Sequence, residues 1–317
     1  MSKFSQILSE SLRRNPLVGI LLSVILFFSA QMLLVGLIAP MVGIPFGINS
    51  EQIIDILSGN LEGIPHSFTF FRLIQFLNQV VVWGLPAVLM ASLLGPVETV
   101  LVLGAPRPRW LPLLAVVTMI ASVPLVQWLY LPAEALQFPE SLAWLEEMLK
   151  EQEEISEKAL MGMFRQEGAG ILVLNLAVFA LMPAICEEFF FRGYLLSHAR
   201  SSWGVHVSVW LVAALFSLVH FQALGFFSRM ILGGFLGYFV VYGNSIWASV
   251  AAHFAFNGTA ILAQVFAPVT EAGTPIEATP EQQRPIWYLA LLSAMATAWL
   301  LTRYQQVASS PQSDPSV

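Results

Sequence analysis

Residues 183–196 read Pro-Ala-Ile-Cys-Glu-Glu-Phe-Phe-Phe-Arg-Gly-Tyr-Leu-Leu, so two adjacent carboxylates and an arginine lie within an apolar run. A charged side chain at bilayer depth costs on the order of 2.5–3.5 kcal/mol even by lenient insertion scales, so such groups usually face a protein interior and have a function. On a helix, Glu188 and Arg192 stand four positions apart on one face and can form an ion pair. Glu187 is turned away from Glu188 by roughly 100°. We therefore expect one carboxylate to be neutralised by the arginine and the other to remain free as a general base.

The composition is that of a membrane protein. Of 317 residues, 57% are hydrophobic and only 11% are charged, whereas about 25% of the residues of a soluble protein are charged. Several apolar runs reach the roughly 20 residues that a helix needs to cross a bilayer. A helix also satisfies its backbone hydrogen bonds within its own segment, as hydrocarbon requires. We predict an all-α, polytopic membrane protein of about eight transmembrane helices, with the lipid bilayer as a partner and no nucleic-acid partner.

Eight apolar segments are predicted to span the membrane. They are residues 17–39, 70–94, 110–131, a fourth that starts at about Gly170 and carries the Glu pair near its end, 205–221, 226–242, 245–266 and 286–301. In the sixth span, the spacing of Gly233 and Gly237 favours close helix packing.

One strongly charged segment separates the third and fourth spans. Residues 139–167 are rich in glutamate, with leucine and methionine at helical spacing between the charges, which predicts an amphipathic acidic helix outside the membrane. The chain thus divides into residues 1–139 with three spans, 140–167 with the acidic helix, 168–268 with the polar motifs, and 269–317 with a loop, the last span and a disordered tail.

Two further polar sets lie in apolar helices. His220 ends the fifth span, and His253 and Asn257 stand four apart on one face of the seventh. A lone membrane histidine is more often a hydrogen-bonded packing residue, but three polar sets on neighbouring spans favour a functional site. A carboxylate beside a histidine can deprotonate a water, and an asparagine amide with a second histidine can donate to an oxyanion. The set suits amide hydrolysis without a serine or cysteine nucleophile.

Three motifs together resemble those of the CPBP family, which comprises the CAAX proteases and bacteriocin-processing enzymes and is also called the Abi or type II CAAX prenyl endopeptidase family. The motifs are Glu-Glu-x-x-x-Arg at 187–192, Phe-x-x-x-His at 216–220 and His-x-x-x-Asn at 253–257, and the resemblance covers about residues 170–266. It implies an eight-helix intramembrane endopeptidase of the glutamic type, which cleaves a protein or peptide at the membrane. By this resemblance Glu187 and His220 would activate water, His253 and Asn257 would stabilise the oxyanion, and Glu188 and Arg192 would hold the geometry of the site.

Other uses of the same residues stay open. Glu187, His220 and His253 would form a zinc site with an open position for water, although no His-Glu-x-x-His is present, and we expect no cofactor to be required. Buried Glu and His also occur in transporters and proton relays, which usually carry inverted repeats that this sequence does not show. A non-proteolytic immunity or scaffold protein is a third alternative. The sequence has no Gly-x-Gly-Asp or Gly-x-Ser-x-Gly motif of other protease classes.

The basic residues predict the orientation in the membrane. With eight spans and the amino terminus inside, eight lysines and arginines fall in inner segments and six in outer ones. We therefore expect a multi-pass protein of the plasma or inner membrane with both termini in the cytoplasm.

Overall fold

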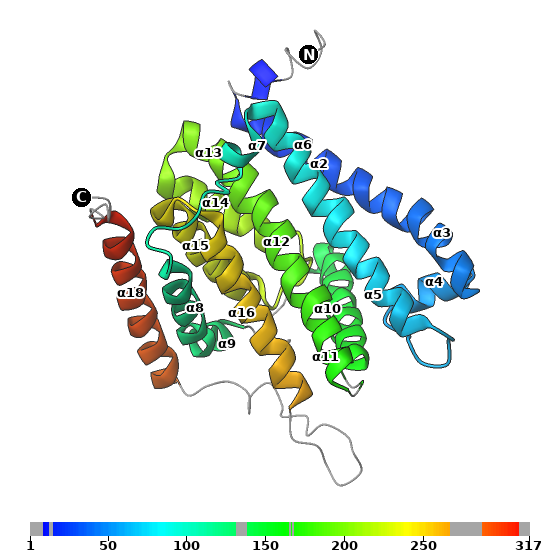
Figure 1. Ribbon diagram of the computed structural model, residues 1–317. Coiled ribbons are helices and arrows are strands. Elements are labelled where there is room, and N and C mark those ends of the chain that lie inside the picture. Colours follow the sequence, from blue (N-terminus) through cyan, green and yellow to red (C-terminus); the bar gives the residue numbers. More distant parts are fainter. Residues whose placement is uncertain are drawn as a thin grey trace.

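The computed structural model describes residues 9–12, 15–130, 138–164, 166, 168–266 and 287–310. The regular elements in these ranges are helices, and none of the described residues forms a strand (Figure 1). This confirms the all-α fold that the apolar composition predicts, because a helix leaves no backbone polar group to be satisfied by hydrocarbon.

Three long helices are continuous, and each contains at least one π-helical turn. The first comprises α2 (Pro16–Leu33), η1 (Leu34–Ile38), α3 (Ala39–Gly43) and η2 (Ile44–Phe46). The second comprises α5 (Ser67–Asn78), η3 (Gln79–Gly84) and α6 (Leu85–Leu94). The third comprises α11 (Ala169–Leu176), η6 (Ala177–Leu181), α12 (Met182–Glu188), η7 (Phe189–Leu195) and α13 (Leu196–Trp203). The π-helical turns η3 and η7 lie in contact next to the Glu pair, and such turns are frequent at functional sites.

The other helices are single pieces or one bent pair. The bent pair is α8 (Leu111–Ala121) and α9 (Val123–Leu129), whose axes differ by 42°. Helix α10 (Ala143–Phe164) follows the short η5 (Glu140–Leu142), and the connections between the first spans hold α4 (Ser50–Leu57) and α7 (Val97–Val100). The remaining helices are α14 (Val205–Leu218), α15 (Phe226–Gly243), α16 (Ile246–Val265) and α18 (Trp287–Ser309).

Each of the eight segments predicted to span the membrane is helical over most of its length. By length and composition, five described helices could cross a bilayer: residues 16–46, 67–94, 169–203, 226–243 and 246–265. The bent pair α8 and α9 makes a sixth if it acts as one span, and α14 is apolar but only 14 residues long. The protein is therefore a polytopic helical membrane protein, whereas the count of eight spans stays a prediction.

Apolar side chains cover the outside of the bundle. Leu21, Ile25 and Met32 of α2 are exposed, and so are large apolar residues of α18, including Leu292 and Trp299. These two helices lie on opposite sides of the bundle in Figure 1. Large exposed apolar side chains on both of these helices suit lipid rather than water.

Two sequence expectations about helix ends were wrong. The helix that carries Glu187 and Glu188 does not end near them, because η7 and α13 continue it to Trp203, so the pair lies in its middle. The residues that follow the pair include three phenylalanines, Tyr194 and two leucines. They are buried in the core or packed against it, and this packing stabilises the continued helix. The last helix continues to Ser309 rather than ending near Leu301. The expected loop at 267–285 and the end of the expected tail lie outside the described residues.

Helix α12 lies at the centre of the bundle, in contact with η3 on one side and α16 on the other (Figure 1). Helices α14 and α15 pack closely through glycines, since a Cβ at Gly233 would lie 3.1 Å from the Cβ of Ala213 and one at Gly237 would lie 3.1 Å from a methyl of Val209. This confirms the close packing that the glycine spacing predicts.

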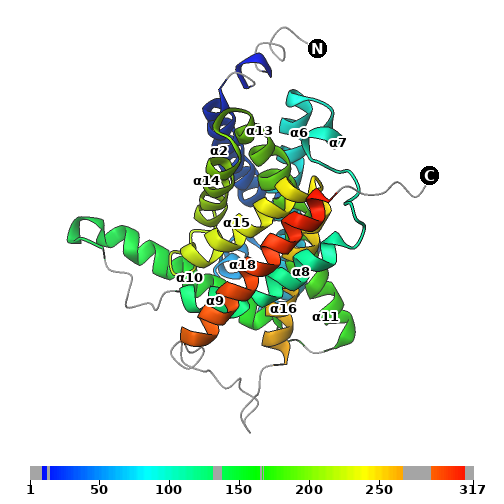
Figure 2. The same cartoon turned by 90° about the vertical axis from the view of Figure 1, so that its left-hand side faces the viewer.

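The charged segment forms the expected amphipathic helix. In Figure 2, α10 extends sideways from the bundle. Its Ala159 and Met163 are buried in a cluster with residues of α4 and α5, such as Ile56 and Phe70, while most of its glutamates stay on the other face. Helix α10 is thus attached to the spans by its apolar face.

Candidate active site

Glu188 and Arg192 form the ion pair that their spacing predicts. The Arg192 Nη1 lies 2.7 Å from the Glu188 Oε1, and both side chains have an exposed fraction of 0%. The π-helical turn η7 begins directly after Glu188, and the pair still forms across it. The charges therefore neutralise each other inside the bundle, where an unpaired charge would be costly.

Arg192 is held by two further elements. Its Nη2 donates a hydrogen bond of 3.2 Å to the backbone oxygen of Gly233 on α15. Its guanidinium carbon lies 4.3 Å from the ring centroid of Phe216 on α14, a cation–π contact. Because a Cβ at Gly233 would lie 3.2 Å from Nη2, the glycine allows α15 to approach this closely. Arg192 therefore connects three helices.

The Glu188 carboxylate accepts two more hydrogen bonds from α16. The Ser249 hydroxyl donates to Oε2 at 2.6 Å, and the His253 Nδ1 lies 2.9 Å from Oε1. With Arg192, these make three donors around one carboxylate, which hold it as an anion and occupy its oxygens. Glu188 is therefore a positioning residue that orients His253.

Glu187 has far fewer partners than its neighbour. The Gln79 Nε2 in η3 donates to its Oε1 at 3.2 Å, and its Oε2 lies 3.9 Å from the His253 Nε2, beyond direct hydrogen-bonding distance. The side chain is buried, with an exposed fraction of 9%. One oxygen of Glu187 thus faces His253 without a direct bond, as the sequence expectation of a free carboxylate requires.

His220 lies in the turn just after α14 and is oriented by the backbone. Its Nδ1 lies 2.8 Å from the Phe216 carbonyl oxygen, and because a carbonyl only accepts, Nδ1 must carry the proton. The neutral ring then has an unprotonated Nε2, which is the form of a general base.

Four of the six predicted site residues line one cavity of about 280 Å³. Glu187 comes from α12, His220 from the turn after α14, and His253 and Asn257 from α16; the apolar walls include Phe179, Phe216 and Phe256. Within the described ranges the Asn257 side chain has no hydrogen-bond partner, so its amide is available to a ligand. The structure therefore brings together an acid or base, two imidazoles and an amide donor, with Glu188 and Arg192 buried next to them.

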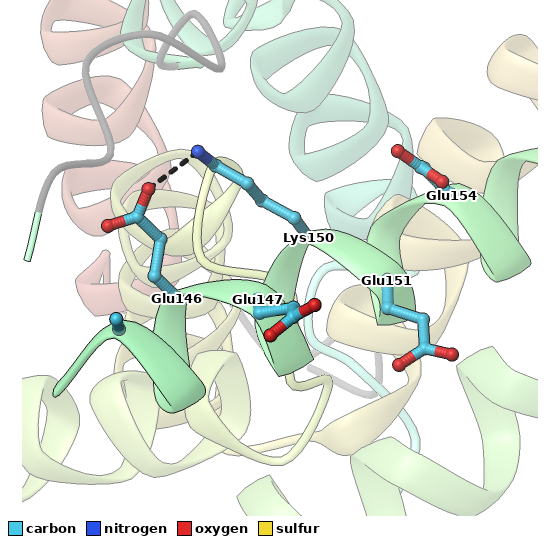
Figure 3. A pocket seen from close by; sticks show the side chains of 6 residues that line it. Glu146, Glu147, Lys150, Glu151 and Glu154 are labelled. Carbon is cyan, nitrogen blue, oxygen red and sulfur yellow. Dashed lines mark hydrogen bonds and ion pairs between the residues drawn. The ribbon is translucent and has the colours of Figure 1, made fainter.

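A larger hollow of about 550 Å³ lies along α10 and has a different character. Figure 3 shows that its polar residues come from this single helix, with Glu147, Glu151 and Glu154 beside the Glu146–Lys150 ion pair. The Lys150 ammonium, and to a lesser extent the Phe138 N–H, hold the pKa of Glu146 below its usual value. This face lacks histidine and an enclosed apolar wall, so it is a solvated helix surface rather than a reaction site.

Three residues that contact or line the site were not predicted from the sequence. Gln79 donates to Glu187, Ser249 donates to Glu188, and Arg229 of α15 lines the cavity. Ser249 had a readable signal, because it stands four residues before His253 and eight before Asn257 on the same helix face. Gln79 and Arg229 had none, because their contacts depend on how helices pack.

The arrangement gives no direct support to the zinc alternative. Among the residues that the structure describes, no three His, Cys, Asp or Glu side chains are grouped to hold a metal ion. The His253 Nδ1 bonds Glu188, so Nε2 is the ring nitrogen that faces Glu187.

Comparison with protein families agrees with the motifs. Residues 169–259 match the family described as type II CAAX prenyl endopeptidase, Rce1-like. The match covers less than a third of the chain, and all six candidate site residues lie within it. No curated protein and no solved structure matches the chain. The family match confirms the resemblance stated from the motifs. The matched region lies within a helical membrane protein.

Proposed function

We propose that this protein, whose residues 169–259 match the type II CAAX prenyl endopeptidases, is an intramembrane endopeptidase that cleaves a membrane-held protein or peptide with a water activated by glutamate and histidine. The observation that carries the proposal is the difference in hydrogen bonding between the two glutamates. Glu188 is saturated by three donors, whereas Glu187 has a single weak donor and lines a cavity with His220, His253 and Asn257. That inequality separates a positioning carboxylate from a reactive one.

In this proposal, Glu187 and His220 activate the water. A water in the cavity donates one proton to the Glu187 carboxylate and can donate the other to the unprotonated Nε2 of His220. As the water oxygen attacks the peptide carbonyl, its proton passes to Glu187. The same proton can then be delivered to the leaving amine, as a base that becomes an acid does.

His253 and Asn257 stabilise the oxyanion that forms on the attacked carbonyl. The Asn257 amide can donate in any protonation state, since it has no described protein partner. The His253 Nδ1–H is fixed on Glu188, so its Nε2 donates only when the ring carries both protons. Removing one such donor from an oxyanion site typically costs about 100- to 1,000-fold in rate.

No step of this mechanism is routed through a metal or another cofactor. Protein side chains supply the base and the oxyanion donors, and the three residues of the zinc alternative are not grouped as metal ligands. We propose that activity is independent of metal, and a chelator tests this directly.

The protein is an integral membrane protein, and we propose that both termini face the cytoplasm. One arginine of each group in the count, Arg192 of the inner and Arg72 of the outer segments, is buried in the bundle. Without them, seven basic residues remain in inner segments against five in outer ones, so the excess of two on the inner side is unchanged. The described start of α2 and the described end of α18 both lie toward the upper end of the bundle in Figure 1.

The decisive experiment is cleavage of a fluorogenic peptide panel by the purified full-length protein in detergent. The panel holds farnesylated and unmodified versions of each peptide, and each reaction is run with and without a chelator. Glu187→Ala, Glu187→Gln and His220→Ala should each lower the rate by about 100- to 10,000-fold while the protein stays folded. The matched control is Glu147→Gln, which removes an exposed carboxylate of α10.

Each outcome has a clear meaning. Cleavage that is lost in the Glu187 variants and kept with chelator supports the proposal. Activity retained by Glu187→Gln contradicts the assigned base, and loss with chelator that zinc restores supports the metal alternative. A wild type that cleaves neither version of any peptide favours the transporter or scaffold alternatives.

A further inference from the structure

The cavity contains a positive charge that the proposed reaction does not use. Arg229, near the start of α15, lines it together with Glu187, His220, His253 and Asn257. Its guanidinium donates to the backbone oxygen of Gln222 at 3.1 Å and to the side-chain oxygen of Gln222, both of which are neutral. Within the described ranges, no carboxylate lies within ion-pair distance of it.

A carboxylate lies near Arg229 but does not pair with it. Glu153 of α10 and Tyr130, just after α9, interact electrostatically with Arg229 from beyond ion-pair distance. The Tyr130 hydroxyl donates to the Glu153 Oε1 at 2.5 Å, while the buried Glu153 Oε2 has no described hydrogen-bond partner. Glu153 therefore lowers the cost of burying Arg229 without occupying the donors of its guanidinium.

An arginine that keeps free donors at the wall of a partly apolar cavity suits an anionic ligand. A guanidinium has five N–H donors in a planar fork that matches the two oxygens of a carboxylate. The Arg229 donors that Gln222 does not occupy remain available. The cavity wall thus combines Glu187 and the two histidines with a cation.

We propose that Arg229 is a specificity-determining residue that binds a carboxylate of the peptide substrate close to the scissile bond. This inference rests on the proposed function and specifies its substrate class: peptides with a negative charge near the cleaved bond. The carboxylate has two sources, the free carboxyl terminus of a peptide cut near its end and an internal Asp or Glu side chain. Both present the same group to the guanidinium.

Arg229 also has a plain structural use, because its bonds to Gln222 connect the first turn of α15 to the 219–225 connection. A structural role would affect all peptides alike. A binding role affects only those that carry the carboxylate. The test therefore measures a ratio between matched peptides rather than activity alone.

The experiment uses dodecapeptides with a farnesylated cysteine four residues from the end, as in a CaaX sequence. One pair ends in a free acid or an amide, and a second pair carries Glu or Gln beside the scissile bond. The ratio of kcat/KM within each pair is measured for wild type, Arg229→Gln, Arg229→Lys and the charge-matched control Arg200→Gln, whose residue is outside the cavity. Binding of the same dye-labelled peptides to Glu187→Gln, with and without Arg229→Gln, is measured by fluorescence anisotropy.

We expect wild type and Arg200→Gln to favour the carboxylate peptide of one pair by at least about tenfold, as charge-assisted hydrogen bonds allow. Arg229→Gln should bring that ratio close to one, and Arg229→Lys should keep part of it. The pair that responds identifies the source of the carboxylate. A ratio of one in wild type for both pairs, or a ratio that Arg229→Gln leaves intact, overturns the proposal. If wild type cleaves nothing, the proposed function fails, and the anisotropy ratio decides on Arg229 by the same criteria.

Discussion

Two ion pairs of this molecule have the same spacing and the same length but different surroundings. Glu188–Arg192 in the bundle and Glu146–Lys150 on α10 are both four residues apart, and in both the nitrogen lies 2.7 Å from the carboxylate oxygen. The exposed fractions are 0% and 0% for the side chains of the first pair, and 23% and 39% for Glu146 and Lys150. Spacing alone predicts the contact in both cases, whereas burial decides how much the contact contributes to the free energy of unfolding.

The partners of each pair show the same contrast. In the bundle, the Gly233 carbonyl, Ser249 and His253 complete the hydrogen bonds of the charged groups. On α10, the Glu146 carboxylate has Lys150 and the Phe138 N–H, and water can reach both charges. The buried pair therefore holds His253 in place at the cavity wall, whereas the contact of the exposed pair can be replaced by contacts with water.

Breaking the buried pair should have the largest effect. Arg192→Met leaves the Glu188 anion buried without its main counter-charge, which typically costs about 3–5 kcal/mol. We expect a strongly lowered unfolding temperature in detergent and no cleavage of any peptide. An unfolding temperature equal to that of wild type would mean that the pair does not stabilise the bundle.

The double variant Glu188→Met/Arg192→Met is the control for this effect. Because it removes both charges, it should be more stable than the sum of the single variants predicts, while remaining inactive. Strict additivity of the two single changes would contradict a direct interaction between the side chains.

Removing one hydrogen bond to Glu188 should have an intermediate effect. Ser249→Ala deletes the donor at 2.6 Å and leaves Arg192 and His253 in place, so we expect a loss of about 1.5–3 kcal/mol. Chemical denaturation in mixed micelles measures it, with Ser208→Ala as the matched control, since the Ser208 hydroxyl is buried without a described partner. Equal losses in the two variants would show that the Ser249 bond adds nothing specific.

The exposed pair should show the smallest effect, and one that depends on pH. The pKa of Glu146 is held below its ordinary value of 4.5, so the contact contributes above that pH and is lost as the pH falls through the lowered pKa. Lys150→Met should leave global unfolding unchanged within error.

Local hydrogen exchange over residues 143–150 tests this pH dependence. Wild type and Lys150→Met should differ slightly at pH 6, and the difference should vanish as the pH falls below the lowered pKa of Glu146. A difference that stays the same as the pH falls would show that Lys150 acts through packing rather than charge.

The sequence by itself determined the features that depend on local spacing and composition. Apolar length predicted the membrane helices, glutamate and leucine spacing predicted α10, and the four-residue interval predicted the Glu188–Arg192 pair. The three motifs also identified the set whose members Glu187, His220, His253 and Asn257 line one cavity. These inferences succeed because a helix places residues three to four apart on one face, whatever surrounds it.

Only the tertiary structure decided which side chains complete the site. Gln79 reaches Glu187 across 108 residues of sequence, Ser249 reaches Glu188 across 61, and the Gly233 carbonyl reaches Arg192 across 41. The position of the Glu pair in the middle of a long helix, and of Arg229 in the cavity wall, likewise came from packing. The physical reason is that the sequence of an apolar helix shows which residues share a face but not which other helix that face contacts. In a membrane, small residues and the close fit between helices decide which faces pack together.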